Sequence, residues 1–182
     1  MNVLVLLSGG IDSATVIGHL LKEGHTVEGL FVNYGQSAID PEQKSVRSVA
    51  EHFGIGLTAI EASARVDRGV GEIIGRNLFL ISAGLMHFPW DQGAIALGLH
   101  SGTPYYDCSS DFIGQTDHII ESSSHGMIRL LCPLATFQKQ EVYEYAASLK
   151  IPIALTYSCE AGTNPPCGNC LSCRDRDGFY VR

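Results

Sequence analysis

The sequence of 182 residues predicts an α/β protein built on a doubly wound parallel sheet. Short apolar runs of strand length alternate with segments of helical periodicity along the first 150 residues. Glycine-rich turns follow several of the runs, and a hydrophobic content of 45% allows a substantial core. Alternation of this kind makes the strands parallel, with right-handed crossovers. We expect one such domain in residues 1–150 and a small appendage in residues 151–182.

The first predicted strand, residues 3–7, leads into the loop Ser8-Gly9-Gly10-Ile11-Asp12-Ser13 and then into a helix whose apolar positions lie between residues 14 and 21. Adjacent glycines let the backbone turn tightly and approach a ligand. The free amides at the start of a helix bind anions, phosphate above all. We expect Asp12 or Ser13 to cap this helix. A plain strand-to-helix turn is the alternative interpretation.

A second strand is predicted over residues 25–32, and it ends at Asn33-Tyr34-Gly35-Gln36. Asp40 and Pro41 predict the start of the next helix, with Asp40 as its cap, and Gly54 predicts its end. A short third strand follows over residues 57–60. Ligands of parallel sheets bind at the carboxyl ends of the strands, so the first loop and the Tyr34–Gln36 turn are expected to face one site.

Residues 78–86 predict a helix that is apolar nearly all round, and we expect it to be buried on the sheet. Arg76 precedes it and is expected to contact a phosphate or a carboxylate, with a solvent-exposed arginine as the alternative. A fourth strand over residues 93–99 delivers Gly98 and His100 to the same sheet edge. Residues 103–110 are expected to form a loop, and residues 128–131 a fifth strand.

The last predicted helix runs over residues 136–150 with Thr136 as its cap. Lys139 lies in its first turn, where the helix dipole disfavours a cation, so we expect a ligand contact or else a solvated side chain. Cys132 is expected to be a small buried residue. For Cys108, a contact with substrate and an ordinary packing role both stay open.

Four cysteines near the end of the sequence have the spacing C-x7-C-x2-C-x2-C, and they are Cys159, Cys167, Cys170 and Cys173. Four thiolates at about 2.3 Å close a tetrahedral zinc site. An iron–sulfur cluster is the alternative, and zinc is favoured because the ligands suffice for one centre only. The Gly- and Pro-rich segment around them has few apolar residues, so the metal is expected to supply its folding energy.

Composition and charge limit the classes of partner that this protein is expected to bind. The formal net charge is −7 and no Lys/Arg cluster is visible, which argues against a nucleic-acid partner and favours a small molecule. No apolar stretch approaches the roughly 20 residues that span a bilayer. The N-terminal apolar run is short and lacks a basic leader, so we expect a cytoplasmic protein without a membrane partner. In such a reducing compartment, the six cysteines are expected to be metal ligands or buried thiols and not disulfides.

The Ser-Gly-Gly-Ile-Asp-Ser string resembles the pyrophosphate-binding loop of the ATP pyrophosphatases, the PP-loop superfamily. It is neither a Walker A loop nor a G-x-G-x-x-G fingerprint. Further motifs follow in one order along the chain and make the sequence similar to the QueC family of 7-cyano-7-deazaguanine (preQ0) synthases. These motifs are Tyr34-Gly35-Gln36, Gly75-Arg76-Asn77, Tyr106-Asp107-Cys108, Pro133-Leu134 with Lys139 and Glu141, the four cysteines, and Arg176 with Gly178-Phe179.

The resemblance implies an adenine nucleotide alpha hydrolase-like fold, ATP, magnesium, structural zinc and a homodimer. It also implies a ligase that adenylates 7-carboxy-7-deazaguanine and converts it with ammonia to the nitrile. The implied catalytic residues are Asp12, Arg76 and Lys139. The implied nucleotide-binding residues are Ser8, Gly9, Gly10, Ile11, Asp12, Ser13, Tyr34, Gln36 and Gly98, and the substrate-binding residues are Arg76, Asn77, His100, Tyr106, Asp107 and Cys108.

The sequence departs from the family pattern at Asn33, where the family has an acidic residue, and at Ser109, where it has an arginine. The segments 62–75 and 99–106 are shorter than in the family. These departures keep two other hypotheses open. One is a divergent QueC-like enzyme that transfers the activated acid to another acceptor, such as a protein amine. The other is a non-catalytic subunit that binds a nucleotide or a deazapurine.

Overall fold

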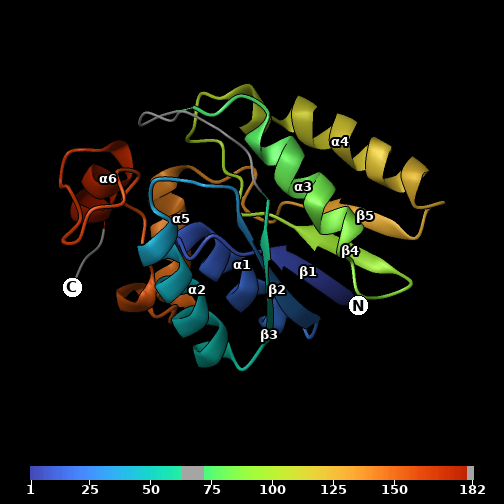
Figure 1. Ribbon diagram of the computed structural model, residues 1–182, viewed down its shortest axis with the longest axis horizontal. Coiled ribbons are helices and arrows are strands. Elements are labelled where there is room, and N and C mark those ends of the chain that lie inside the picture. Colours follow the sequence, from blue (N-terminus) through green and yellow to red (C-terminus); the bar gives the residue numbers. More distant parts are fainter. Residues whose placement is uncertain (63–71, 180–182) are drawn as a thin grey trace.

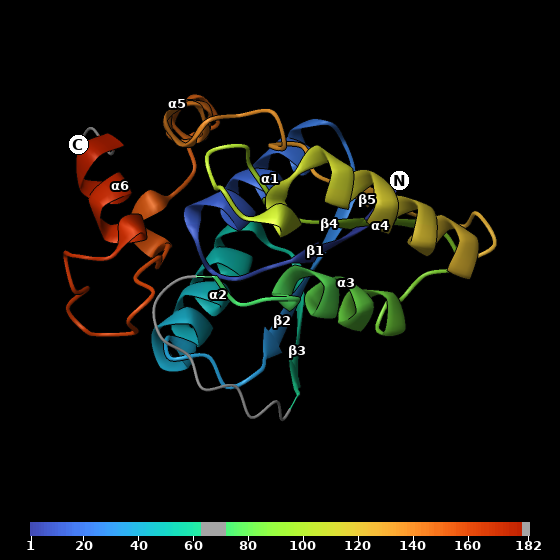
Figure 2. The same cartoon turned by 90° about the horizontal axis from the view of Figure 1, so that it is seen from above.

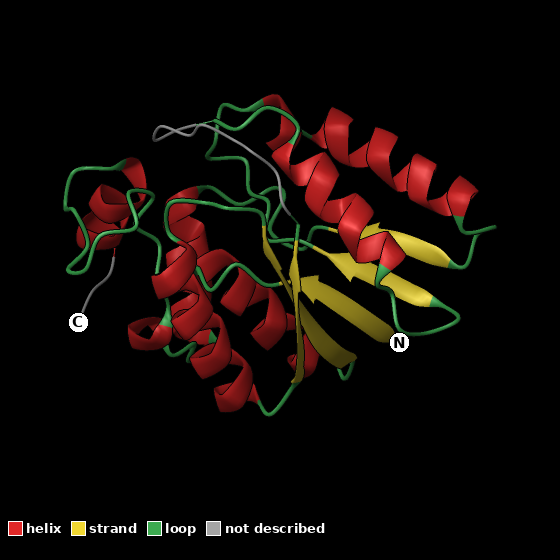
Figure 3. Ribbon diagram, in the orientation of Figure 1, coloured by secondary structure: helices red, strands yellow, loops and turns green. Residues whose placement is uncertain are grey.

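Residues 1–62 and 72–179 are described by a computed structural model of the chain. Five strands form one sheet in the order β3-β2-β1-β4-β5, and every neighbouring pair is parallel (Figure 3). The strands are β1 (Asn2–Leu6), β2 (Thr26–Asn33), β3 (Gly56–Glu61), β4 (Gly93–Ala96) and β5 (Ile128–Leu131). The predicted parallel sheet is confirmed. The fourth strand ends earlier than expected, at Ala96 and not at Leu99.

Helices cover both faces of the sheet, as the doubly wound class requires (Figures 1 and 2). One face carries α1 (Ile11–Lys22), α2 (Ile39–Phe53) and α5 (Lys139–Ser148), and the other carries α3 (Arg76–Met86) and α4 (Ser110–Ser123). Two short 3-10 helices, η1 (Tyr106–Cys108) and η2 (Ile153–Leu155), and the C-terminal helix α6 (Leu171–Phe179) complete the described elements. The strands point toward the side of the molecule on which α6 lies (Figure 1).

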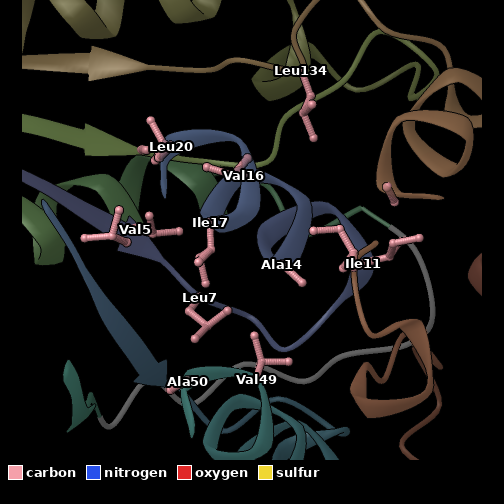
Figure 4. Packing of buried hydrophobic residues seen from close by; sticks show 14 of the residues in the cluster. Val5, Leu7, Ile11, Ala14, Val16, Ile17, Leu20, Val49, Ala50 and Leu134 are labelled. Atoms are coloured by element: carbon pink, nitrogen blue, oxygen red, sulfur yellow. The ribbon is translucent and has the colours of Figure 1, made fainter. Parts of the chain in front are cut away.

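The sheet separates two apolar clusters, and strand β1 contributes to both. Val3 and Val5 pack under α1, α2 and α5, while Leu4 and Leu6 pack under α3 and α4. A strand covered on both faces is apolar at every position, which explains the uninterrupted run in the sequence. Figure 4 shows the first cluster, with Leu7 between the side chains of α1 and those of α2.

Three helix starts differ from the sequence-based expectation. Helix α1 begins at Ile11 with Gly10 as its N-cap and no side-chain cap, so the expected cap by Asp12 or Ser13 is wrong. The Ser13 hydroxyl donates instead to the Gly10 carbonyl oxygen over 3.1 Å. Because the glycine backbone supplies the turn, no side chain of the described chain occupies the first amides of the helix.

Helices α2 and α5 also begin elsewhere than predicted. Helix α2 begins at Ile39 with Ala38 as its N-cap, not with Asp40, which lies inside its first turn. Helix α5 begins at Lys139 and not after Thr136. Its cap is Gln138, whose side chain accepts from the Glu141 amide while the Glu141 carboxylate accepts from the Gln138 amide over 2.6 Å. A reciprocal box of this kind outcompetes a single threonine cap.

Two helices on the second face were misjudged from the sequence. Helix α3 is not buried all round, since the side chains of Leu78, Phe79 and Met86 are 45%, 39% and 84% exposed. Helix α4 was not predicted, because its buried residues are only Phe112, Thr116 and Ile120 within a polar segment. The expected loop 103–110 also contains the 3-10 helix η1. Among the described residues, no helix combines the length and apolarity that a membrane crossing needs.

Candidate active site

A cavity of about 320 Å³ opens at the carboxyl ends of β1, β2 and β4. Strands β1 and β4 are neighbours whose following helices lie on opposite faces, which makes this the switch point where such sheets bind ligands. Most of the residues predicted from the sequence meet here. Those that line the cavity are Ser8, Gly10, Asp12, Ser13, Tyr34, Gln36, Arg76, Asn77, Gly98, His100, Cys108 and Lys139.

The glycine loop after β1 fits closely against α2. Gly9 has φ +80°, and a Cβ there would lie 3.0 Å from the Ser45 hydroxyl. That hydroxyl oxygen lies 2.7 Å from the carbonyl oxygen of Gly9 and 2.7 Å from that of Leu155. Since a hydroxyl has one proton, the two carbonyl groups share it. Ser45 therefore joins the loop to the stretch that precedes the cysteines.

Gly98 brings the end of β4 against the first turn of α1. A Cβ at Gly98 would lie 2.8 Å from the Asp12 carbonyl carbon and 3.0 Å from the Ser13 amide nitrogen. These are backbone atoms, which do not move aside without shifting the helix. The glycine lets the chain pass directly beside the helix start.

Lys139 is paired with Asp12 in the structure. Its Nζ lies 2.7 Å from Oδ1 and 2.8 Å from Oδ2 of the Asp12 carboxylate. The lysine is therefore not a solvated side chain, and it stands at the head of α1, where the expectation placed a ligand. His100 lies nearby, and burial lowers its pKa. The Gly102 amide donates to His100 Nδ1 over 3.1 Å, which assigns the ring proton to Nε2.

Arg76 is the first residue of α3, directly after Gly75 with φ +77°. Its Nε donates to Asn77 Oδ1 over a long 3.4 Å. No carboxylate in residues 1–62 or 72–179 forms an ion pair with it, in contrast to Lys139. A half-buried guanidinium in a cavity without a protein anion is suited to an anionic ligand.

The Tyr106-Asp107-Cys108 motif reaches the cavity only through Cys108. The Asn77 side chain donates from Nδ2 to the Asp107 carbonyl oxygen over 3.2 Å. The Asn77 backbone N–H donates to Asp107 Oδ2 over 3.4 Å. Tyr106 is 56% exposed and donates to Asp111. Neither Tyr106 nor Asp107 is among the residues that line the cavity. Burial and the neighbouring Asp107 raise the pKa of the Cys108 thiol to about 11.

The two residues that differ from the family pattern support local backbone structure. Asn33 Oδ1 accepts from the Gly35 amide over 3.0 Å and so closes the Tyr34-Gly35 turn. Ser109 is the N-cap of α4, and its hydroxyl accepts from the Phe112 amide over 3.2 Å.

Cys132 was expected to be buried, but the structure shows it only half-buried. Its surroundings still raise the pKa of its thiol to about 12, mainly through burial.

Several residues that line the cavity were not found from the sequence: Glu42, Tyr105, Tyr143, Tyr157, Ser158, Glu160, Ser172 and Asp175. Glu42 had a usable signal, an acidic side chain in the first turn of a helix that follows a strand's carboxyl end. Burial raises its pKa to about 7, although its bond from Gln36 and the field of Arg76 act in the opposite direction. The residues after 156 had no signal, because only tertiary structure folds the tail back onto the site.

The four predicted metal ligands come together. The sulfur atoms of Cys159, Cys167, Cys170 and Cys173 all lie within 4.8 Å of one another. A tetrahedral zinc with bonds of about 2.3 Å separates its sulfurs by roughly 3.8 Å, so the set fits one such ion. The amides of Asn169 and Cys170 each donate to Cys167 Sγ over 3.4 Å, which stabilises a thiolate.

The cysteine segment is attached to the Ser8–Ser13 loop (the nucleotide loop) and to α2. The Tyr157 amide donates to the Gly9 carbonyl oxygen over 2.9 Å. Gly162 has φ +70°, and a Cβ there would lie only 2.2 Å from the Ser37 carbonyl oxygen. Arg176 of α6 donates to the carbonyl oxygens of Thr156 and Ile153 over 2.8 and 3.0 Å. Both views place the segment beside α2 and α5 (Figures 1 and 2).

The parallel sheet and the Ser-Gly-Gly-Ile-Asp-Ser loop at its switch point define a PP-loop nucleotide-binding α/β protein. The chain belongs to the QueC family. The family model described as "Queuosine biosynthesis protein QueC" matches residues 2–72 and 70–181.

Two curated relatives match almost the whole chain. The 7-cyano-7-deazaguanine synthase of Synechococcus sp. (strain RCC307) is 34% identical over 97% of this chain and 92% of the relative. That of Prochlorococcus marinus (strain AS9601) is 31% identical over 100% of this chain and 94% of the relative. The first alignment extends over 210 residues, more than this chain contains, so the relative carries insertions that this chain lacks. Of the two segments predicted to be short, residues 63–71 of the first lie outside the described residues.

Solved structures support the same fold at low sequence identity. A predicted subunit of a tRNA methyltransferase from Methanocaldococcus jannaschii has a TM-score of 0.58 at 20% identity, covering 81% of this chain and 76% of that one. The NMN synthetase of Francisella tularensis has a TM-score of 0.51 at 18% identity, covering 99% and 78%. A 4-thiouridine synthetase in complex with RNA and ATP has a TM-score of 0.51 at 18% identity, covering 85% and 42%.

Proposed function

We propose that this chain is an ATP-dependent ligase that converts 7-carboxy-7-deazaguanine with ammonia into 7-cyano-7-deazaguanine. One observation carries the proposal: in a chain of the QueC family, a PP-loop shares one cavity with a guanidinium that has no ion pair within residues 1–62 and 72–179. ATP adenylates the acid, ammonia displaces AMP to give the amide, and a second ATP activates the amide for dehydration. The two other hypotheses, another acceptor and a non-catalytic subunit, are not favoured by the names of the relatives.

In this proposal, the Ser8–Ser13 loop holds the phosphates of ATP. The first turn of α1 has no side-chain cap, so its amides are available to an anion. Asp12 would hold a magnesium ion, which would supply positive charge to balance the phosphates. Gln36 contributes by position, because its side chain accepts from the Tyr34 amide over 3.0 Å and donates to Glu42 over 2.8 Å.

We place the acid on the other side of the cavity, where Arg76 binds its carboxylate. Asn77, His100 and Cys108 line the wall for the deazaguanine ring. His100 is a neutral donor through Nε2, and the protonated Cys108 thiol is not a nucleophile. Tyr106 and Asp107 act indirectly. Asp107 fixes Asn77, and Tyr106 lies outside the cavity.

The four cysteines would hold a structural zinc ion that folds the C-terminal segment. Residues 1–150 then form the nucleotide-binding unit, and residues 151–182 form a zinc segment packed on it. A homodimer acting in the cytoplasm completes the proposal. Light scattering during gel filtration measures the mass in solution, and a mass of one chain would contradict the dimer.

The direct test supplies the purified protein with ATP, magnesium, ammonia and 7-carboxy-7-deazaguanine. Mass spectrometry is expected to detect the nitrile and AMP in this mixture and neither product without the acid. AMP release that needs an added protein amine in place of ammonia would favour the other acceptor. Tight binding of the acid without any AMP would favour the non-catalytic subunit.

A further inference from the structure

Glu42 presents a carboxylate to the cavity from the first turn of α2. Its Oε2 accepts a hydrogen bond from Gln36 Nε2 over 2.8 Å. Gln36 is fixed in turn, because its Oε1 accepts from the Tyr34 amide. Within residues 1–62 and 72–179, Oε1 of Glu42 has no hydrogen-bond partner. One carboxylate oxygen is therefore held in place while the other remains available to a ligand.

Glu42 lines the cavity together with residues of the Ser8–Ser13 loop and with Arg76. The Glu42 carbonyl oxygen would lie 3.1 Å from a Cβ at Gly9, so the first turn of α2 touches the nucleotide loop. Arg76 of α3 acts on the carboxylate through its field but forms no ion pair with it. Tyr157 is a further titratable group near it, since Glu42 contributes to its raised pKa. Glu42 and Arg76 thus line the same cavity without being paired to each other.

A negative group at this place opposes the binding of ATP and of a carboxylic acid. Both substrates are anions, and a carboxylate near them raises the energy of the complex. The third substrate, ammonia, exists at neutral pH mainly as the ammonium cation. A carboxylate is the side chain that binds this cation and can also remove its proton.

We propose that Glu42 is the binding site and the proton acceptor for the nitrogen donor. The inference rests on the proposed function and assigns to it a residue that neither the sequence motifs nor the comparisons singled out. Ammonium binds at Glu42 Oε1, beside the carboxyl group that Arg76 holds. Gln36 is a positioning residue that keeps Oε1 turned toward the cavity.

The proposed step transfers protons and electron pairs between ammonium, Glu42 and the adenylated acid. Ammonium transfers one proton to Glu42, leaving ammonia and a neutral carboxylic acid. The lone pair of ammonia forms the C–N bond at the adenylated acyl carbon, the bond from that carbon to the AMP oxygen breaks, and AMP leaves with the electron pair. The proton that the new amide nitrogen sheds goes to the AMP phosphate, and Glu42 returns its proton to water.

The proton affinity of Glu42 suits this step. Burial raises its pKa to about 7, so the carboxylate and the acid form interconvert near neutral pH. A general base works best when its pKa lies close to the operating pH. A surface glutamate with an ordinary pKa is a weaker base and accepts the ammonium proton less readily.

The test compares Glu42→Gln with the wild type in three assays. ATP–pyrophosphate exchange that depends on the acid measures adenylation without any nitrogen donor. Amide formation with ammonia measures the full first half-reaction. Hydroxamate formation with hydroxylamine measures attack by a nucleophile that is already unprotonated at neutral pH. Glu51→Gln is the matched control, because Glu51 is an exposed residue on the same helix that does not line the cavity.

We expect Glu42→Gln to keep ATP–pyrophosphate exchange and hydroxamate formation within about threefold of the wild-type rates. Its rate of amide formation with ammonia is expected to fall by about 100-fold. A loss of less than about threefold with ammonia would overturn the proposal. An equal loss with ammonia and hydroxylamine would also overturn it, since that result marks a structural role. Wild-type protein without exchange would refute the proposed function itself and remove the basis of this inference.

Discussion

Lys139 and Asp12, which are 127 residues apart in the sequence, form an ion pair at the cavity, in which Lys139 Nζ lies 2.7 Å from Asp12 Oδ1 and 2.8 Å from Oδ2. Lys139 begins α5 and Asp12 lies in the first turn of α1. The helix dipole favours the aspartate and disfavours the lysine at such places. The pair therefore fixes a cation at the nucleotide loop that α5 alone would not stabilise.

Replacement of Lys139 is expected to impair adenylation. Lys139→Met removes a positive charge beside the proposed phosphate site, which weakens the binding of the nucleotide anion. We expect a fall of about 100-fold in acid-dependent ATP–pyrophosphate exchange. Lys44→Met is the control, since Lys44 is exposed on α2. Exchange within about threefold of wild type would contradict the assignment of Lys139.

Gly98→Ala tests the contact between β4 and the start of α1. Its new methyl group would meet backbone atoms of Asp12 and Ser13 at 2.8–3.0 Å, so the helix start must shift. Overpacking of this kind costs about 1–3 kcal/mol, measured by urea unfolding, and ATP affinity should fall with it. Gly114→Ala, in α4 with open space around it, should stabilise the protein slightly. Equal effects of the two changes would refute the packing argument.

Ser45→Ala removes the hydroxyl shared by the carbonyl groups of Gly9 and Leu155. The Leu155 carbonyl then loses this donor, while the Gly9 carbonyl keeps the Tyr157 amide, and the loss costs about 1–3 kcal/mol of unfolding free energy. Since Gly9 belongs to the nucleotide loop, the KM for ATP should rise as well. Ser48→Ala serves as the control, since Ser48 lies on the same helix and its hydroxyl has no hydrogen-bond partner within residues 1–62 and 72–179. An unchanged KM for ATP would show that the loop does not depend on this hydroxyl.

Loss of the proposed zinc ion is expected to affect the Ser8–Ser13 loop as well as the C-terminal segment. Cys170→Ser should reduce bound metal well below one ion per chain, because the other three sulfurs leave the tetrahedral set incomplete. The hydrogen bond from the Tyr157 amide to the Gly9 carbonyl oxygen should then weaken, and ATP binding should weaken with it. Metal analysis and calorimetric ATP titration measure the two effects. Cys132→Ser lies outside the cluster and should leave both unchanged.

Cys108 is expected to react slowly with iodoacetamide. With a pKa of about 11, its thiol is almost fully protonated at pH 8, and only the thiolate is nucleophilic. Its alkylation rate should increase as the pH rises toward that value, which mass spectrometry of the Cys108 peptide follows over time. Rapid labelling at pH 7 would contradict the structural environment found for this thiol.

The sequence by itself determined the sheet, the nucleotide loop and the four cysteines. Each is a local pattern: apolar runs in β1 and β4, the residues Ser8 to Ser13 between a strand and a helix, and cysteine spacings that suit one ion. Local patterns are readable because period, turn residues and ligand spacing act over a few positions. Helix α4 was missed for the same reason, since its apolar stripe is too sparse to identify without β5 beside it.

Only the tertiary structure decided how the site is assembled. The pairing of Lys139 with Asp12, the approach of Gly98 to α1 and the contact of Tyr157 with Gly9 join residues far apart in the chain. It also separated Tyr106 and Asp107 from the cavity and brought Glu42 into it. Burial and electrostatic fields depend on these long-range contacts, so the raised pKa of Glu42 follows from packing that no sequence pattern contains.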